Sequence, residues 1–233
     1  MPDWLHPTLR QYDQTADRRH KTRRSRRVRT LIALLLFTSA TPAAAQDGLP
    51  SGDELLAEIN RIRANPARYA RELRVQRTWF RGRIFMSPDG YPLQTAEGVA
   101  ALDDAIAVLG RQPALPPLAW SDVLAEAATD HAISQGEAGA RGHIGRDGSN
   151  PGQRVKQHGG DIYVAESIAY GPFDAAGVIR SLIVDDGVAA RGHRKMLLAS
   201  QYRHVGALCA EHAVSRVICV FDFAATPDGR PVT

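Results

Sequence analysis

Two histidines and three carboxylates in the second half of the chain are of types that can do chemistry together. His143 and His193 each follow a glycine, Glu166 lies between them, and Asp185 and Asp186 shortly precede the second histidine. Two neutral imidazoles with one or two carboxylates can hold a divalent ion such as Zn²⁺. The same groups can form a hydrogen-bonded network without metal, and their spacings of 23, 19 and 8 residues match no compact ligand motif. A shared site, such a network, and separate surface histidines all remain open.

Several common catalytic motifs are absent from the sequence. It contains no Gly-x-Ser-x-Gly elbow, no His-Glu-x-x-His, no Gly-x-x-x-x-Gly-Lys and no dinucleotide glycine fingerprint. These motifs position a nucleophile, zinc ligands or phosphate groups. Their absence argues against the serine hydrolase, zincin, NTPase and dehydrogenase classes.

The first 45 residues have the pattern of an export signal. An arginine-rich stretch from Arg18 to Arg29 precedes the apolar run Leu31–Ala40 and the small residues Ala43–Ala45. A run of ten residues is shorter than the roughly 20 that span a bilayer as a helix, so we expect a leader cleaved after Ala45 rather than a permanent anchor. The arginine pairs leave twin-arginine export open beside general secretion, and the true start residue is also open. Residues 46–233 are then periplasmic or extracellular.

The charge of the chain changes sign when this leader is set aside. The whole chain has a formal net charge of +4, whereas residues 46–233 carry 20 Lys+Arg and 22 Asp+Glu. Nucleic-acid binding needs a basic folded domain that neutralises phosphates. The domain is therefore not expected to bind nucleic acid.

One basic segment remains in the exported part, with eight arginines between Arg61 and Arg83. Four of them recur at three-residue intervals, which would place them in one stripe on a helix: Arg68, Arg71, Arg74 and Arg77. Such a stripe could touch anionic lipid head groups or envelope polymers, or it could be an ordinary solvated helix face. Membrane contact is expected only through this surface or an uncleaved leader.

The 188 residues from Gln46 onward suit a single domain. Apolar periodicity and capping residues predict helices over 53–64, from Pro66, over 95–109, from Ser121 to Gly136, over 151–158 and over 174–185. Residues 162–170 read as a strand. His131 is expected at the helix surface or in a cap, and Ile133 is expected to point inward. Helices and strands without a βαβ rhythm predict an α+β or layered α/β/α domain.

The only two cysteines lie in two β-type runs near the C-terminus. Cys209 belongs to the run Val205–Cys209 and Cys219 to the run Arg216–Phe223, with a polar connection between them. Folding a hairpin about Val214 places the two cysteines opposite each other, within disulfide range. Oxidising conditions outside the cytoplasm favour the bond, which would leave no thiol nucleophile; two buried free thiols are the alternative.

Short motifs along the exported part occur in the order found in one known family. They are Leu56-Ala57-Glu58-Ile59-Asn60-Arg61-Ile62-Arg63, Pro117-Leu118-Ala119-Trp120, Gly142-His143, Ala165-Glu166-Ser167-Ile168, Gly192-His193-Arg194-Lys195 and Val205-Gly206. The chain thereby resembles the CAP superfamily, or SCP domain, which includes cysteine-rich secretory, antigen 5 and pathogenesis-related 1 proteins. The resemblance runs from about Gly52 to Ala224 and is to a bacterial secreted branch.

The resemblance implies a three-layer α-β-α sandwich with a large cleft that gathers two histidines and two acids. Carried onto this chain, these are His143, Glu166, His193 and Asp185, with Asp186 competing for the last position. Zn²⁺ is the implied possible metal. Aspartate is one methylene shorter than the usual glutamate, which puts a four-ligand site in question.

The functions implied by the resemblance are several. A cleft that binds a lipid, peptide or envelope component is favoured over enzymatic activity. The alternatives are a metal-assisted or general-base hydrolase using Glu166, His143 and His193, and a structural or adhesive envelope protein. Arg141 and Arg191, each two residues before a cleft histidine, could bind an anionic ligand or pair with Asp147 and Asp186. The segment between residues 74 and 116, longer than in many members, could line or cover the cleft.

Overall fold

The computed structural model describes residues 48–86, 88, 92–171 and 173–232. The export leader and its expected cleavage site after Ala45 lie outside these residues, so both stay predictions. Within the described part, no helix is long and apolar enough to cross a membrane.

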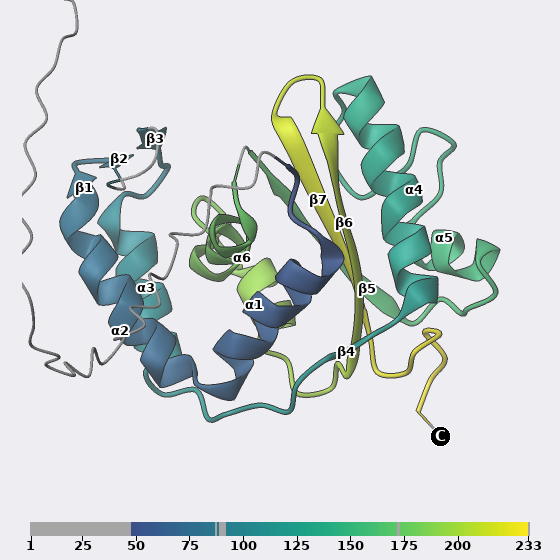
Figure 1. Ribbon diagram of the computed structural model, residues 1–233, viewed down its shortest axis with the longest axis horizontal. Coiled ribbons are helices and arrows are strands. Elements are labelled where there is room, and N and C mark those ends of the chain that lie inside the picture. Colours follow the sequence, from purple (N-terminus) through teal and green to yellow (C-terminus); the bar gives the residue numbers. More distant parts are fainter. Residues whose placement is uncertain (1–47, 87, 89–91, 172, 233) are drawn as a thin grey trace, which may run out of the picture. The chain divides into compact units, whose positions relative to one another are not determined.

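A four-stranded sheet forms the middle layer of the domain (Figure 1). Its strand order is β4-β6-β7-β5, with β4 parallel to β6 and the other neighbours antiparallel. The strands are β4 (Ala119–Trp120), β5 (Val164–Tyr170), β6 (His204–His212) and β7 (Arg216–Ala224). Strand β5 is therefore an edge strand. One of its faces contacts α5, and the opposite face contacts α6 and α7.

Helices cover both faces of this sheet. On one face lie α4 (Asp122–Ala138) and α5 (Pro151–Gln157). On the other lie α1 (Gly52–Ala64), α6 (Ala175–Val184) and α7 (Gly192–Leu197). The arrangement confirms the predicted three-layer α-β-α sandwich.

Alternation along the long strands divides the core into two parts, because successive side chains of a strand point to opposite faces. Phe221 and Phe223 pack toward α1 and α6 with the largest apolar cluster. Ile168 and Val220 pack toward α4 with a smaller cluster. Asp222, between the two phenylalanines, is thereby directed to the α4 face.

A second, smaller group of elements lies beside α1 and α6. It contains α2 (Pro66–Gln76), the 3₁₀ turn η1 (Arg77–Trp79), α3 (Val99–Leu109) and a three-stranded sheet of β1 (Phe80–Arg81), β2 (Ile84–Phe85) and β3 (Leu93–Gln94). Helix α3 packs on α2 and α6 (Figure 1). These elements occupy most of the segment that was expected to be long.

The helix start signals were mostly confirmed. Asn65 caps α2 ahead of Pro66, Ser121 caps α4, and Asp174 caps α6. The predicted start of a helix at Thr95 was wrong, because Thr95 donates its hydroxyl to the Arg83 carbonyl and α3 begins only at Val99.

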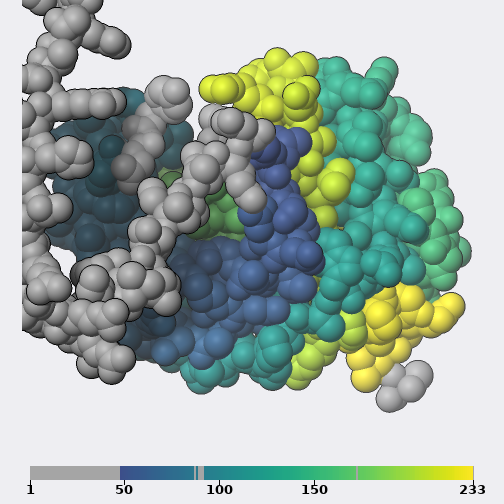
Figure 2. Space-filling model, in the orientation of Figure 1, coloured from purple at the N-terminus to yellow at the C-terminus, as the bar shows by residue number. Residues whose placement is uncertain are grey.

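Helix α4 runs past its predicted stop at Gly136 and ends at Ala138. A side chain at position 136 would place its Cβ 2.1 Å from the Glu211 carbonyl oxygen, so glycine serves close packing against the hairpin rather than helix termination. Figure 2 shows the yellow-green end of the hairpin against the teal surface of α4. Ile133 was also predicted wrongly, since it is 46% exposed.

The arginine stripe is divided by structure and by ion pairs. Helix α2 ends at Gln76, so Arg77 belongs to the following turn, where it pairs with Asp103 at 2.8 Å. Arg68 pairs with Glu72 on its own helix at 3.3 Å. Two of the four positive charges are therefore already neutralised, which weakens the stripe as a membrane-binding surface; that contact stays a prediction.

The predicted disulfide between Cys209 and Cys219 is present. The two residues are direct partners in the register of β6 and β7. The hairpin prediction is thus confirmed together with its register.

Reduction of this bond is expected to lower the free energy of unfolding by about 2–3 kcal/mol, because the bond closes a loop with a sequence separation of 10 residues in the unfolded chain. Urea unfolding with and without reductant measures the effect. In the variant Cys209→Ser/Cys219→Ser, reductant should change nothing. An unchanged unfolding midpoint of the reduced wild type would contradict the prediction.

Candidate functional site

His143 and Glu166 form a histidine–carboxylate pair at the edge of the sheet. Glu166 lies on β5, and its side chain is 1% exposed, whereas the His143 side chain is 50% exposed. The ring nitrogen Nδ1 of His143 lies 2.7 Å from Glu166 Oε1. The buried carboxylate thus orients an imidazole that is accessible to solvent.

Arg154 of α5 holds the other side of this glutamate. Its guanidinium lies 2.5 Å from Glu166 Oε2, and the Arg154 side chain is 3% exposed. The same group donates to the backbone carbonyls of Ser149 at 3.0 Å and His143 at 3.3 Å. Asn150 caps α5 and Pro151 begins it, which fixes the helix that carries the arginine. One buried cation therefore connects the glutamate, the histidine loop and α5.

His131 lies behind this pair and is 1% exposed, so the expectation of a surface or capping histidine was wrong. Its Nε2 lies 2.8 Å from the Gly142 carbonyl oxygen, which can only accept, so Nε2 carries the proton. Burial lowers the pKa of His131, against the raising effect of Glu166. A neutral His131 thus supports the backbone next to His143.

His193 and Asp185 form a second histidine–carboxylate pair. Asp185 ends α6 in the left-handed conformation, at φ 57°, which aspartate tolerates better than most residues. Its Oδ1 lies 2.7 Å from His193 Nδ1, and its Oδ2 accepts from the backbone N–H groups of His193 and Arg194. The aspartate therefore fixes both the ring of His193 and the first turn of α7.

Asp186, the competing candidate, does other work. Its carboxylate accepts from the backbone N–H groups of Ala96, at 2.6 Å, and Glu97, at 2.8 Å, just before α3. It therefore anchors α3, and Asp185 is the acid that contacts the histidine.

The two imidazoles have the same tautomer when they are neutral. Each Nδ1 faces a carboxylate, so the proton of the neutral ring is placed there by the hydrogen bond, and Nε2 is left as an acceptor. Such a ring can take a proton from a ligand or water, accept a hydrogen bond, or bind a metal with the acid behind it.

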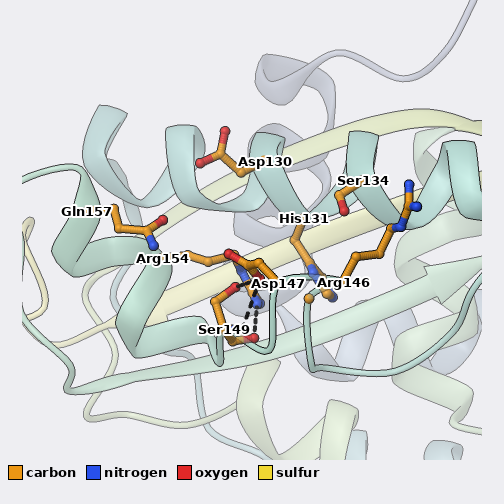
Figure 3. A pocket seen from close by; sticks show the side chains of 9 residues that line it. Asp130, His131, Ser134, Arg146, Asp147, Ser149, Arg154 and Gln157 are labelled. Atoms are coloured by element: carbon orange, nitrogen blue, oxygen red, sulfur yellow. Dashed lines mark hydrogen bonds between the residues drawn. The ribbon is translucent and has the colours of Figure 1, made fainter.

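A polar pocket of about 330 Å³ lies beside the first pair (Figure 3). It is open to solvent on one side and is lined by α4, the turn before α5 and α5 itself. Its lining residues are Asp130, His131, Ser134, Gly145, Arg146, Asp147, Ser149, Arg154 and Gln157. His131 and Arg154 belong both to this lining and to the surroundings of Glu166, so the pocket and the pair share a wall.

The sequence also matches the model of a known protein family. The family described as "CAP: Cysteine-rich secretory protein family" matches residues 56–223. The chain belongs to the CAP family. Among curated protein sequences, none matches this CAP protein.

Solved structures similar to this CAP protein are distant in sequence. An outer surface protein from Borrelia burgdorferi is 22% identical, with a TM-score of 0.39 over 47% of this chain and 77% of that one. An extracellular protein containing an SCP domain from Bacillus anthracis is 23% identical, with a TM-score of 0.39 over 47% of this chain and 34% of that one. The crystal structure of NaASP2 with Zn²⁺ is 13% identical, with a TM-score of 0.38 over 78% of this chain and 84% of that one.

In this CAP protein the four predicted site residues form two pairs, His143 with Glu166 and Asp185 with His193. Within the described ranges, no group of three histidine, cysteine, aspartate or glutamate side chains is placed to hold a metal ion. All four carboxylate oxygens of the two acids already accept hydrogen bonds. The donor set therefore does not fit a four-ligand zinc site, and a single shared cluster stays a prediction.

The two arginines near the histidines differ in their contacts. Arg191 pairs with Glu97 at 2.6 Å and with Asp104 at 3.1 Å, not with the expected Asp186. It lowers the pKa of Glu97 to about 2. Arg141 donates to Ser215 and stacks on Tyr170. Arg191 is thus committed to the protein, and the role of either arginine in ligand binding stays a prediction.

Sequence reasoning missed Asp222, which is directly opposite Glu166 in the register of β5 and β7. Asp222 is fully buried, and neither of its side-chain oxygens has a hydrogen-bond partner. Burial, and then the negative charge of Glu166, raise its pKa well above the usual range. The available signal was an acid within the apolar run Val217–Phe223.

Proposed function

We propose that this CAP-family protein is exported and binds a polar ligand of the kind that peptides and envelope components present. The leader pattern, the disulfide and the family description support export. The polar pocket beside the His143–Glu166 pair is the proposed binding site.

The observation that carries this proposal is the construction of the pocket. Its wall contains the buried Arg154, which is fixed by Glu166 and two carbonyls, so the pocket is preorganised. Arg146 is an exposed cation at the pocket, with no ion pair to any described residue. Hydroxyl, amide and carboxylate groups complete the lining. Two carboxylates, Asp130 and Asp147, offset the free cation, so this chemistry suits a small polar ligand with hydrogen-bonding groups better than an acyl chain.

A pocket-filling variant tests the proposal. Ser134→Phe introduces a ring from α4 into the pocket, whereas the neighbouring Ile133→Phe leaves the pocket open because Ile133 is not part of its lining. Calorimetric titration uses acetyl-alanyl-aspartate and N-acetylglucosamine as probes. At least one probe should bind the wild type and Ile133→Phe alike, and should bind Ser134→Phe at least tenfold more weakly. Equal binding to Ser134→Phe, or no binding of either probe to the wild type, would contradict the proposal.

Hydrolysis is a second candidate because the His143–Glu166 pair resembles a general base with its orienting acid. Neither His143 nor His193 has a hydrogen bond to a serine, threonine or cysteine side chain in the described part of the chain, so water would be the nucleophile. Incubation of the peptide probe with wild type and His143→Gln, followed by mass spectrometry, separates the two functions. Intact peptide is the expected result, and cleavage that is lost in His143→Gln would establish the hydrolase.

A further inference from the structure

A second cavity, of about 230 Å³, lies away from the polar pocket, where the small sheet and α3 meet α6. Its apolar wall comes from the small sheet, from α3, and from α6 with the residues before it: Phe80, Phe85, Leu93, Leu102, Phe173 and Val184. Phe85 also packs on the rings of Phe80 and Trp79, with centroids 5.1 and 5.9 Å apart. The cavity corresponds to about eight water molecules in volume. It can hold a compact aromatic body and is too small for a two-chain lipid.

Arg180 of α6 introduces a positive charge into this apolar lining. Its guanidinium lies over the Phe85 ring, with 4.9 Å between the Cζ atom and the ring centroid. Stacking uses the face of the guanidinium and leaves its N–H edge free to donate. Among the described residues, Arg180 has no ion pair and no side-chain hydrogen bond, and its guanidinium contacts the Phe85 ring. Its donors are thus available to a ligand.

The acid at the same cavity does not compensate for this cation by direct contact. Asp186 lines the cavity, but its two oxygens accept from the backbone N–H groups of Ala96 and Glu97. The remaining polar side chains are uncharged: Gln76, Gln94, Thr95, Tyr170 and Ser181. Arg180 is therefore the one charged lining group, among those described, whose hydrogen-bonding capacity is unused.

We propose that this cavity binds a small aromatic monocarboxylate, with its ring among the phenylalanines and its carboxylate on Arg180. The combination of an apolar enclosure with one oriented charged donor is typical of small-molecule sites. A guanidinium edge is well matched to a carboxylate, since two parallel N–H groups can meet its two oxygens. This second site goes beyond the proposed function of the polar pocket and does not depend on it.

The test compares two probes of equal shape, 3-phenylpropionate and its neutral amide, by calorimetric titration of the wild type. We expect the acid to bind at least tenfold more tightly than the amide, because a hydrogen bond to a charged group is worth about that factor. In Arg180→Gln this preference should disappear. The exposed Arg71, on α2 and outside the cavity, supplies the control Arg71→Gln, which should keep the preference.

Further arms keep the two sites distinguishable. Ser134→Phe should bind 3-phenylpropionate as the wild type does, even if the probes for the polar pocket fail. Should Arg180→Gln not fold, the comparison of acid and amide in the wild type still decides. Equal affinity for acid and amide, unchanged affinity in Arg180→Gln, or no binding of the acid by the wild type would each overturn the proposal.

Discussion

Replacing Glu166 with glutamine is expected to lower the free energy of unfolding by about 3–5 kcal/mol. The reason is that Arg154, whose side chain is 3% exposed, would keep its charge in the interior without its carboxylate. Removing one member of a buried ion pair usually costs this much, since the remaining charge is still desolvated. The glutamine can still accept one hydrogen bond, from His143 or Arg154, but not carry the compensating charge. Urea unfolding at neutral pH measures the loss, provided that the slope of the unfolding free energy against urea concentration is the same in both proteins.

An exposed acid provides the control for this substitution. Glu126 pairs with His158 at 3.1 Å, but its side chain is 60% exposed, so Glu126→Gln should change stability by less than about 1 kcal/mol. The double variant Glu166→Leu/Arg154→Met removes both charges and should recover much of the loss, as replaced buried pairs often do. If Glu166→Gln were as stable as the wild type, the buried pair would not hold the site together.

The parts of the fold that the sequence predicts correctly are those with a local physical cause. The caps Asn65, Ser121 and Asp174 accept hydrogen bonds from the first turn of their own helices, so neighbouring residues determine them. The hairpin is also local, because its register follows from two apolar runs and a short turn. The start of α3 and the continuation of α4 through Gly136 depend instead on contacts with distant segments.

The candidate site divides in the same way. Types and motif order could indicate His143, Glu166, Asp185 and His193, and the structure then shows which acid contacts which histidine. Nothing local indicates that Arg154 would reach Glu166, or that His131 would be buried, because both follow from the packing of α4 and α5 on the sheet. The cavity at Arg180 likewise requires segments that are far apart in the sequence. Tertiary packing, not composition, creates these features.

The free energy of unfolding of Asp222→Asn is expected to increase, relative to that of the wild type, as pH rises. The pKa of Asp222 is raised in the folded state by burial and by Glu166, so the folded protein keeps the proton that the unfolded chain releases above about pH 4. The folded state then binds more protons, and the free energy of unfolding of the wild type falls by about 1.4 kcal/mol per pH unit from this group. The fall continues until the folded pKa is reached. Asparagine resembles the neutral acid and does not titrate, so the variant lacks this term.

The measurement is urea unfolding of wild type and variant between about pH 4.5 and 6.5, above the ordinary pKa of an aspartate, and the quantity compared is the difference between their free energies of unfolding. His131, His143, Glu166 and Arg154 surround the same region and are present in both proteins, so their own titrations largely cancel in the difference. Glu211→Gln, an exposed acid on β6, should differ from the wild type by a nearly constant amount. A pH-independent difference for Asp222→Asn would mean that Asp222 is ionised in the folded protein. Two negative charges, on Asp222 and Glu166, would then lie side by side in the interior. Arg154 would have to compensate both of them, and not Glu166 alone.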